Sequence, residues 1–232
     1  MAKKIYFSRY DNEPDVYEPK PASKFLPEWY KSAFSYFNNE KKPKFGQPYA
    51  TIKRCVPVFD SLTAGYMITL DRDLYCEQLE DGPYFHWRSE ADVSPEIITN
   101  HTEYQVQGHP DNNLGYQLKL DNPWVIKTDP GYSCMVLPPM HRDNVLIVLP
   151  GIVDTDIYYE KINLPFNLKD KNFEGMIEAG TPIAQVIPFK RESYSMEVVP
   201  LDKKRLLVNK KTIASKIFDA YRSLYWIRKE YK

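Results

Sequence analysis

Short apolar runs alternate with turn residues along the middle of the chain. One run of strand length occupies residues 145–149 and ends at a Pro-Gly pair. Asp154 and Asp156 follow it directly, and a second apolar run occupies residues 183–187. Gly180, just before that second run, can adopt the positive φ angle that a tight turn requires. The pattern predicts a buried strand, an acidic turn and a return strand.

Similar strand patterns recur along much of the chain. Residues 51–59 and 64–70 are rich in β-forming side chains, and Asp81-Gly82 marks a hairpin turn. The chain also has 18 Tyr, 11 Phe and 19 Pro but only 9 Gly, which favours short, aromatic-packed strands between proline-marked turns. The prediction is a mainly β fold with one body, a β-barrel or β-sandwich of short strands, at residues 48–200.

The N-terminal segment, residues 1–47, differs from this body. Its first 22 residues contain three prolines among charges and tyrosines, which predicts an extended arm without a core of its own. A short helix with one strongly aromatic face is expected after Ser23. That face comprises Leu26, Trp29, Tyr30, Ala33, Phe34 and Phe37. Two alternatives are open for its burial, on the same chain or on another subunit.

The C-terminal segment, residues 201–232, predicts a basic amphipathic α-helix capped by Asn209 or Thr212. Residues 203–232 hold ten basic and two acidic side chains, so they carry +8 and the remainder −8, because the net charge is zero. A basic helix can lie on a membrane or on nucleic acid, but it is more often docked with its basic face solvated. We therefore expect docking on an acidic partner or a neighbouring subunit, without direct nucleic-acid contact.

Composition argues against several classes of protein. No run of 18 apolar residues is present, and no apolar stretch at the start is long enough for a signal peptide. We therefore expect neither a transmembrane segment nor secretion. The three cysteines, an odd number, indicate reduced thiols rather than a disulfide framework. The four histidines have irregular spacing and do not predict a metal site.

Two motifs in the second half of the chain resemble those of a known superfamily. Residues 151–156 read G-I-V-D-T-D, with Glu160 nine positions after the glycine. They resemble the G-V-I-D-x-D-Y-x-G-E motif of the dUTPase/dCTP-deaminase superfamily. Residues 179–186 resemble the G-x-R-I-A-Q-L strand that follows in that superfamily. Residues 63–66 and 138–144 are similar to its A-G-Y-D and P-R-S-G segments.

This resemblance covers roughly residues 50–192 and implies a dUTPase-like β body that self-associates, commonly as a trimer. A second resemblance covers nearly the whole chain. Residues 20–30 and 225–231 are similar to the K-P-A-S-K-x-x-P-x-W-Y and Y-W-x-x-K-x-Y motifs of proteins encoded by large tailed phages. It implies a phage protein that acts in the host cytoplasm or in the virion.

The superfamily resemblance assigns roles to six residues. Three are catalytic candidates, Asp154, Glu160 and Arg142, and three are nucleotide-binding candidates, Asp156, Tyr158 and Gln185. In an active member, Asp154 would orient the attacking water, and a tyrosine would close the sugar pocket beside a metal-bound triphosphate. Several positions depart from this pattern. Ile157 occupies the tyrosine position, Met67 replaces a metal-contacting acid, and the Ser-Gly pair that grips phosphate is absent.

These departures favour loss of catalysis. The leading interpretation is a structural or assembly protein whose terminal elements dock on other copies or on other phage proteins. The alternatives are a deoxynucleotide-processing hydrolase, of the dUTPase or dCTP-deaminase type, and a regulatory module that binds nucleotide without turnover. A Mg²⁺ cofactor is expected only for the hydrolase. Asp154 and Asp156 also fit a purely structural turn, in which their carboxylates accept hydrogen bonds from backbone amides.

Overall fold

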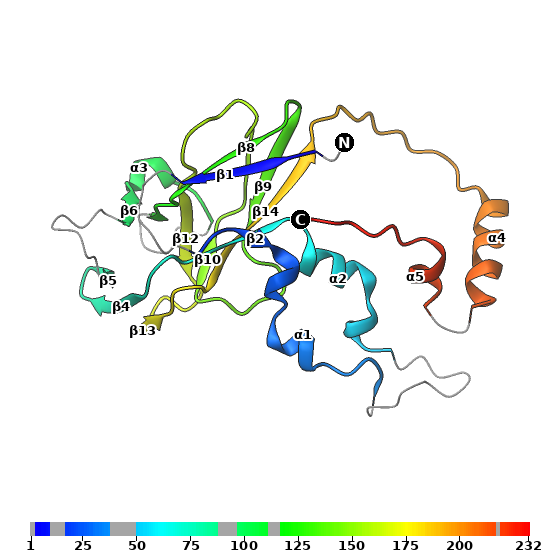
Figure 1. Ribbon diagram of the computed structural model, residues 1–232, viewed down its shortest axis with the longest axis horizontal. Coiled ribbons are helices and arrows are strands. Elements are labelled where there is room, and N and C mark those ends of the chain that lie inside the picture. The colour runs from blue at the N-terminus through cyan, green and yellow to red at the C-terminus, as the bar shows by residue number, and fades with distance from the viewer. Residues whose placement is uncertain (1–2, 10–16, 38–49, 88–96, 111–116, 217–218) are drawn as a thin grey trace. The chain divides into compact units, whose positions relative to one another are not determined.

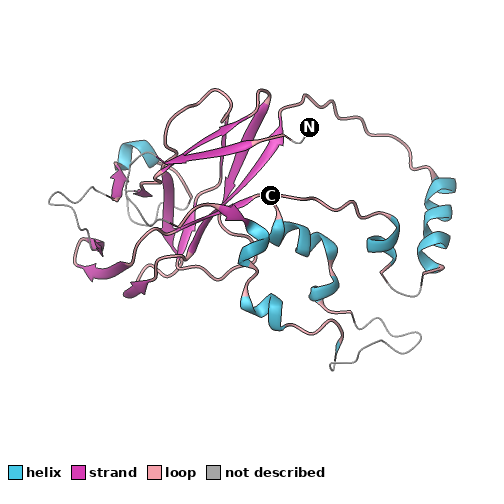
Figure 2. Ribbon diagram, viewed as in Figure 1, coloured by secondary structure: helices cyan, strands magenta, loops and turns pink. Residues whose placement is uncertain are grey.

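The computed structural model describes residues 3–9, 17–37, 50–87, 97–110, 117–216 and 219–232 (Figure 1). The chain divides into two compact units. The β unit comprises Met1–Phe25 and Gly65–Arg191, and the helical unit comprises Leu26–Ala64 and Glu192–Lys232. Figure 2 shows that strands dominate the first unit and helices the second. The division into three segments that the sequence predicts, 1–47, 48–200 and 201–232, stays a prediction.

The described residues of the β unit form four antiparallel sheets. The largest has the order β11 (Gly151–Val153), β9 (Tyr132–Leu137), β14 (Pro182–Lys190), β3 (Tyr66–Thr69) and β2 (Lys20–Pro21). A second has the order β10 (Leu146–Val148), β12 (Leu164–Leu168), β7 (Gln117–Leu120) and β6 (Ile98–His101). A third joins β13 (Gly175–Ile177), β4 (Leu74–Leu79) and β5 (Gly82–Trp87), and the last pairs β1 (Ile5–Arg9) with β8 (Trp124–Thr128).

This architecture confirms the predicted mainly β class. The apolar runs at 145–149 and 183–187 form β10 and β14, and the hairpin predicted at Asp81-Gly82 joins β4 to β5. All four sheets are open over the described residues, so the barrel that we considered is not closed there.

An apolar core lies inside the β unit, because alternate side chains of its strands point inward. Its members include Leu74, Cys76, Phe85, Ile126, Cys134 and Phe166. Phe85 and Phe166 meet edge to face, with ring centroids 5.9 Å apart. This packing couples the three-stranded sheet to the four-stranded sheet.

Two glycines fix the backbone around β14. Gly65 has φ 69°, and a Cβ atom there would lie 2.0 Å from the carbonyl oxygen of Val186, so only glycine fits. Gly180 has φ 82°, which confirms the predicted turn. Its amide donates to the carbonyl oxygen of Leu70 at 2.7 Å. Gly180 thus fixes the chain just before β14 against Leu70, and Gly65 allows the middle of β14 to approach the chain just before β3.

The first residues of the chain correct one expectation. Residues 5–9, predicted to be part of an arm without a core, form β1 and pair with β8. Ile5 and Phe7 pack against the core of the β unit. The strand fits this position because Ile5 and Phe7 alternate with the more exposed Tyr6 and Ser8. Residues 20 and 21 are also paired, as β2, with Pro21 opposite Tyr66 of β3.

The helical unit holds α1 (Glu28–Ser32), η3 (Ile52–Arg54) and α2 (Val56–Thr63). The predicted N-terminal helix is thus shorter than its expected aromatic face, because Leu26, Ala33, Phe34 and Phe37 lie outside it. The strand predicted at residues 51–59 is wrong, because η3 and α2 form there instead. Pro57 lies in the first turn of α2, where a proline needs no hydrogen-bond partner. The apolar residues Val56, Phe59 and Leu62 recur every third position, which also suits a helix. Two short helices outside this group are η1 (Ala22–Phe25) and α3 (Glu103–Val106), both in the β unit.

The C-terminal helix starts earlier than predicted. α4 (Lys203–Ala214) is capped by Asp202, whose carboxylate accepts a hydrogen bond from the amide of Arg205 at 3.0 Å. Asn209 and Thr212 lie within this helix, so the caps proposed for them are wrong. A separate helix, α5 (Ala220–Leu224), follows. Among the described helices, none combines the length and the apolar character needed to cross a membrane.

Candidate functional site

The acidic turn after β11 is brought against two other strand ends by sheet register. Val153 pairs with Cys134 of β9, and Lys190 of β14 pairs with Tyr132. The residues that follow β11, precede β9 and follow β14 therefore meet at one end of these three strands. Arg191, just beyond β14, donates its backbone amide to the carbonyl oxygen of Gly131 at 2.9 Å. This register places a guanidinium beside the two carboxylates.

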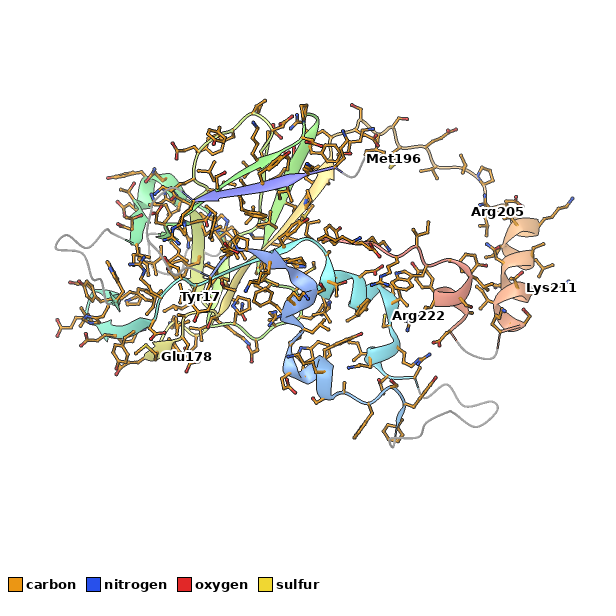
Figure 3. The ribbon with its side chains drawn as sticks, in the orientation of Figure 1. Tyr17, Glu178, Met196, Arg205, Lys211 and Arg222 are labelled. Carbon is orange, nitrogen blue, oxygen red and sulfur yellow. The ribbon has the colours of Figure 1, made fainter. Side chains whose placement is uncertain are left out.

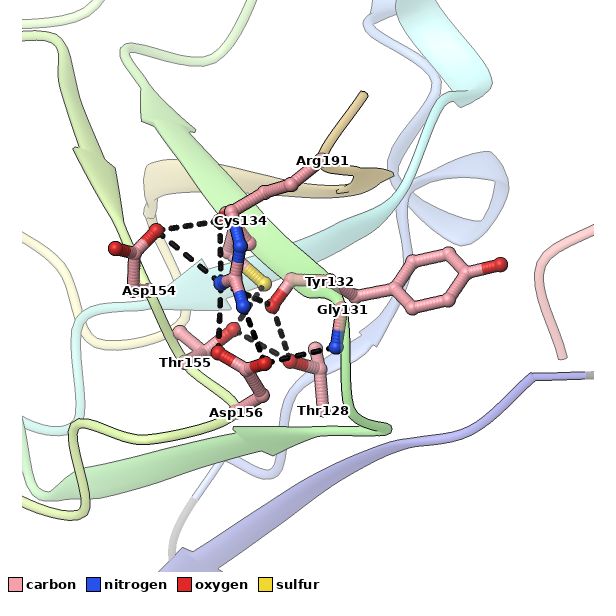
Figure 4. A network of polar contacts seen from close by, with 9 residues as sticks. Thr128, Gly131, Tyr132, Cys134, Asp154, Thr155, Asp156 and Arg191 are labelled. Carbon is pink, nitrogen blue, oxygen red and sulfur yellow. Dashed lines mark hydrogen bonds and ion pairs between the residues drawn. The ribbon is translucent and has the colours of Figure 1, made fainter. Parts of the chain in front are cut away.

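Arg191 holds Asp156 by two parallel contacts (Figure 4). Nη1 lies 2.6 Å from Oδ1 of Asp156, and Nη2 lies 2.5 Å from Oδ2. The amide of Gly131 also donates to Oδ2, at 2.8 Å. The side chain of Asp156 is only 6% exposed. Such a two-point, charge-assisted pair fixes orientation as well as charge.

The surroundings of Asp156 favour its charged form. The hydrogen bonds from Arg191, followed by that from the Gly131 amide, lower the pKa of Asp156 from 3.8 to about 2. The same carboxylate raises the pKa of Arg191 above its ordinary value. Asp156 is therefore an ionised structural partner at neutral pH, and all of its strong contacts are made within the protein.

Asp154 belongs to the same network but is more open. Its Oδ1 accepts a hydrogen bond from the hydroxyl of Ser133 at 2.6 Å and lies 3.3 Å from Nη1 of Arg191. Its side chain is 52% exposed. Oδ1 is thus held by Ser133 and Arg191, whereas the side chain as a whole still reaches solvent.

Buried hydroxyl groups contact the acidic turn on the side that faces the core. Thr155 is 1% exposed, and its hydroxyl lies 2.8 Å from that of Thr128 and 3.3 Å from the thiol of Cys134. The Thr128 hydroxyl donates to the carbonyl oxygen of Tyr132 at 3.0 Å. Burial raises the pKa of Cys134, so its thiol stays neutral. The sequence D-T-D therefore directs two carboxylates to Arg191 and the hydroxyl between them to the buried Thr128.

Two other candidates line a separate cavity of about 520 Å³ in the β unit. Tyr158 and Glu160 share it with Lys119, Asp121 and Lys161. Nζ of Lys161 lies 2.8 Å from a carboxylate oxygen of Asp121, and Glu160 accepts a hydrogen bond from the Lys161 amide at 2.7 Å. The cavity thus combines one aromatic ring with charges of both signs.

The remaining two candidates lie near β14 and the loop before β10. Gln185 is fully buried, and its Oε1 accepts a hydrogen bond from the amide of Met140 at 3.1 Å. Arg142 is partly buried, and its Nη2 atom is buried without a hydrogen-bond partner among the described residues. Burial lowers the pKa of Arg142. Gln185 thus holds the loop at residues 138–144, whereas Arg142 has a buried nitrogen without a hydrogen-bond partner among the described residues.

The six candidates therefore lie in three places. Asp154 and Asp156 share the Arg191 network, Tyr158 and Glu160 share one cavity, and Gln185 and Arg142 lie at the 138–144 loop or against it. Sequence reasoning missed Arg191 and Ser133. Arg191 could have been proposed as a partner of the acidic turn, because a basic residue follows the strand β14. That proposal would have required knowing that β14 pairs with β9.

No protein-family model and no curated protein matches the chain. Similar solved structures include the native EIAV dUTPase, at 14% identity and a TM-score of 0.31, which covers 61% of this chain and 87% of that one. A mutant dUTPase of Staphylococcus bacteriophage 80alpha with dUpNHpp covers 86% of this chain and 90% of its own, at 10% identity and a TM-score of 0.36. Another structure of that phage dUTPase covers 56% and 97%, at 12% identity and a TM-score of 0.26.

Proposed function

We propose that this chain is a phage-encoded structural or assembly protein in which the β unit is a scaffold and the C-terminal segment docks on a second copy. The contacts of the acidic turn support a scaffold role for the β unit. Asp156 is nearly buried in its pair with Arg191, and Asp154 is tied to Ser133 and Arg191. Asp156, used in this way, stabilises the turn and is poorly placed to orient a water molecule for attack, whereas Asp154 is held through one oxygen only.

One observation carries the docking proposal, namely the exposed apolar side chains between β14 and the end of α4. Five residues that precede α4 are between 65% and 89% exposed. They are Tyr194, Met196, Val198, Val199 and Leu201. Four more in α4 are between 38% and 62% exposed, namely Leu206, Leu207, Val208 and Ile213. Contiguous exposed apolar surface of this kind is typical of a segment that binds another protein.

The charge of this segment indicates the chemistry of its partner. α4 contains five basic residues and no acidic one, namely Lys203, Lys204, Arg205, Lys210 and Lys211. Figure 3 labels Arg205 and Lys211 on this helix and Met196 on the extended segment before it. An acidic surface with exposed apolar side chains would complement both properties.

The outer face of the β13-β4-β5 sheet has both properties. Its exposed side chains include Tyr75, Leu79, Tyr84 and Met176. Register places Tyr75 opposite Met176 on one side and opposite His86 on the other. Acidic residues on or beside these strands include Glu77, Glu80, Asp81, Glu174 and Glu178, the last labelled in Figure 3. We therefore infer that the C-terminal segment of one copy docks on this face of another.

The test removes apolar surface from the segment and leaves its charge unchanged. Met196→Ser combined with Val198→Ser should convert the oligomer to monomer in light scattering coupled to size-exclusion chromatography. Tyr104→Ser is the matched control, because Tyr104 is 82% exposed but lies in α3 of the β unit. An oligomer that survives the double substitution would refute docking through this segment.

A nucleotide-binding role is the second candidate, favoured by the cavity that holds Tyr158, Glu160, Lys119 and Lys161. Thermal melting with deoxynucleoside mono-, di- and triphosphates, with and without Mg²⁺, tests it. A ligand at 100 times its Kd should stabilise the fold by about 2.7 kcal/mol. Asp154 and Asp156 are both engaged by Arg191, so they do not fit a Mg²⁺ site, and we derive no catalytic step through the metal. A shift that Glu160→Gln abolishes would support this role, and the absence of any shift would exclude it.

A further inference from the structure

A second cavity, of about 340 Å³, lies wholly within the helical unit. Its walls include three aromatic side chains, Tyr30, Phe59 and Trp226, and two cationic ones, Lys53 and Arg222. We propose that this cavity binds a small aromatic anion, meaning a planar ring that carries a phosphate or carboxylate group. The proposal is independent of the docking proposal and of the dUTPase-like motifs.

The cavity brings together residues from the two segments, 20–30 and 225–231, that resemble motifs of phage proteins. Residues 20–30 provide Tyr30, and residues 225–231 provide Trp226. Between them lies Phe59 of α2, whose ring centroid is 6.3 Å from that of Tyr30 and 6.4 Å from that of Trp226. These rings give the cavity an aromatic wall, and its volume lies within the range of small-molecule sites.

The polar ends of two of these rings are already satisfied. The hydroxyl of Tyr30 donates to the carbonyl oxygen of Lys53 at 3.1 Å. Nε1 of Trp226 lies 3.0 and 3.1 Å from the two carboxylate oxygens of Asp60. These contacts hold both rings in place before a ligand arrives, which lowers the entropic cost of binding.

The charge of the cavity is positive. Lys53 donates only to neutral acceptors in its described hydrogen bonds, the carbonyl oxygens of Tyr30 and Lys31, so its charge is not neutralised there. The guanidinium carbon (Cζ) of Arg222 lies 5.4 Å from the ring centroid of Trp226. Arg54, which also lines the cavity, is paired with Asp219. Among the described lining residues none is acidic, so an anion is favoured and a cation is disfavoured.

Helix α2 adds to this preference, because its N-terminus opens at the cavity. Cys55 and Val56 line the wall where the helix starts, and no side chain caps that end. The first turn also contains no acidic residue. Partial positive charge at an uncapped helix start favours an anionic group there. The cations, the aromatic rings and the helix start therefore select the same class of ligand.

Alkylation of Cys55 gives a direct readout. Cys55 is exposed and lines the cavity, whereas Cys76 and Cys134 are buried. The probes are thymidine 5′-monophosphate and indole-3-acetate, with thymidine and indole as uncharged controls. At about ten times its Kd, a bound probe should slow iodoacetamide labelling of Cys55 roughly tenfold by occupancy alone. Isothermal titration calorimetry then measures the affinity, and comparison of the two anions distinguishes a phosphate from a carboxylate ligand.

Arg222→Gln and Lys53→Gln should each weaken binding roughly tenfold, as expected for loss of one charge-assisted contact. Circular dichroism melting of each variant reports whether the helical unit still folds, and either folded variant suffices. The Met196→Ser and Val198→Ser double variant should bind as the parent does, which separates this site from docking. Failure of both anions to bind or protect Cys55 would overturn the proposal. Equal effects of the uncharged probes, or unchanged affinity in the charge variants, would also overturn it.

Discussion

Arg191 and Asp156 form a two-point ion pair between the end of β14 and the turn after β11, with oxygen–nitrogen distances of 2.6 and 2.5 Å. The pair joins residues 35 positions apart and leaves the Asp156 side chain 6% exposed. It is the central contact of the acidic turn, and it accounts for one of the two acids that resemble a catalytic motif. The other, Asp154, contacts the same guanidinium from a more open position.

Asp156→Asn should therefore lower the melting temperature more than Asp154→Asn. The first substitution weakens both contacts with Arg191 and places an uncharged amide opposite a guanidinium. The second keeps an acceptor for the Ser133 hydroxyl and removes only a longer ion pair. Differential scanning calorimetry of the two isosteric variants checks the order. An equal or reversed order would show that the ion pair does not hold the turn.

The pKa of Asp156 predicts acid sensitivity. A carboxyl whose pKa falls from 3.8 to about 2 on folding binds fewer protons in the folded state than in the unfolded state. Its contribution to stability is full above the unfolded pKa and is lost as the pH falls through the folded pKa. The stability gap between the parent and Asp156→Asn should therefore be constant above about pH 5 and shrink between about pH 4 and pH 2. Denaturant titrations at stepped pH measure this gap, and a gap that persists at pH 2 would contradict the assignment.

Gly65→Ala should be strongly destabilising, because a Cβ atom would lie 2.0 Å from the carbonyl oxygen of Val186. The positive φ alone costs about 1–2 kcal/mol for a residue with a side chain, and forced overpacking adds about 1–3 kcal/mol. Gly108→Ala is the matched control, since it has φ 77° and its Cβ would meet no described atom within 4 Å. Urea unfolding should show the larger loss for Gly65→Ala. Similar losses for both variants would mean that β14 and Gly65 do not approach so closely.

Salt should weaken association if α4 docks on an acidic face. The five basic residues of α4 act over a screening length of about 10 Å at 0.1 M salt and about 3 Å at 1 M. Raising the NaCl concentration across this range should increase the dissociation constant roughly tenfold without abolishing apolar contacts. Glu174→Gln combined with Glu178→Gln should reduce this salt dependence. Association that is insensitive to salt would exclude the charged component.

The sequence pattern predicted elements where apolar and turn residues alternate clearly. Residues 145–149 and 183–187 became strands, and Asp81-Gly82 became a hairpin turn. The predicted strand at residues 51–59 was wrong. This stretch is rich in β-forming residues, but its apolar residues from Val56 onward also have helical spacing. Periodicity also cannot reveal long-range pairing, so the match of β1 with β8 was missed.

The candidate site shows the same limit. Asp154 and Asp156 are recognisable as an acidic turn, but the partner that determines their role is Arg191, which only the pairing of β14 with β9 brings near. Tyr158 and Glu160 follow that turn closely in sequence, yet they line a cavity formed with Lys119 of β7. The sequence alone cannot distinguish acids that hold a turn from acids that face a ligand, because the difference lies in those distant neighbours.

The most direct measurement of the docking proposal is sedimentation equilibrium of the full chain across a wide range of concentrations. Exposed apolar side chains from Tyr194 to Val208 should drive self-association, so the mass should rise to a multiple of the chain mass and reach a plateau. The Met196→Ser and Val198→Ser double variant should remain monomeric over the same range. A parent chain that is monomeric at every concentration would contradict the proposal that this segment docks on a second copy.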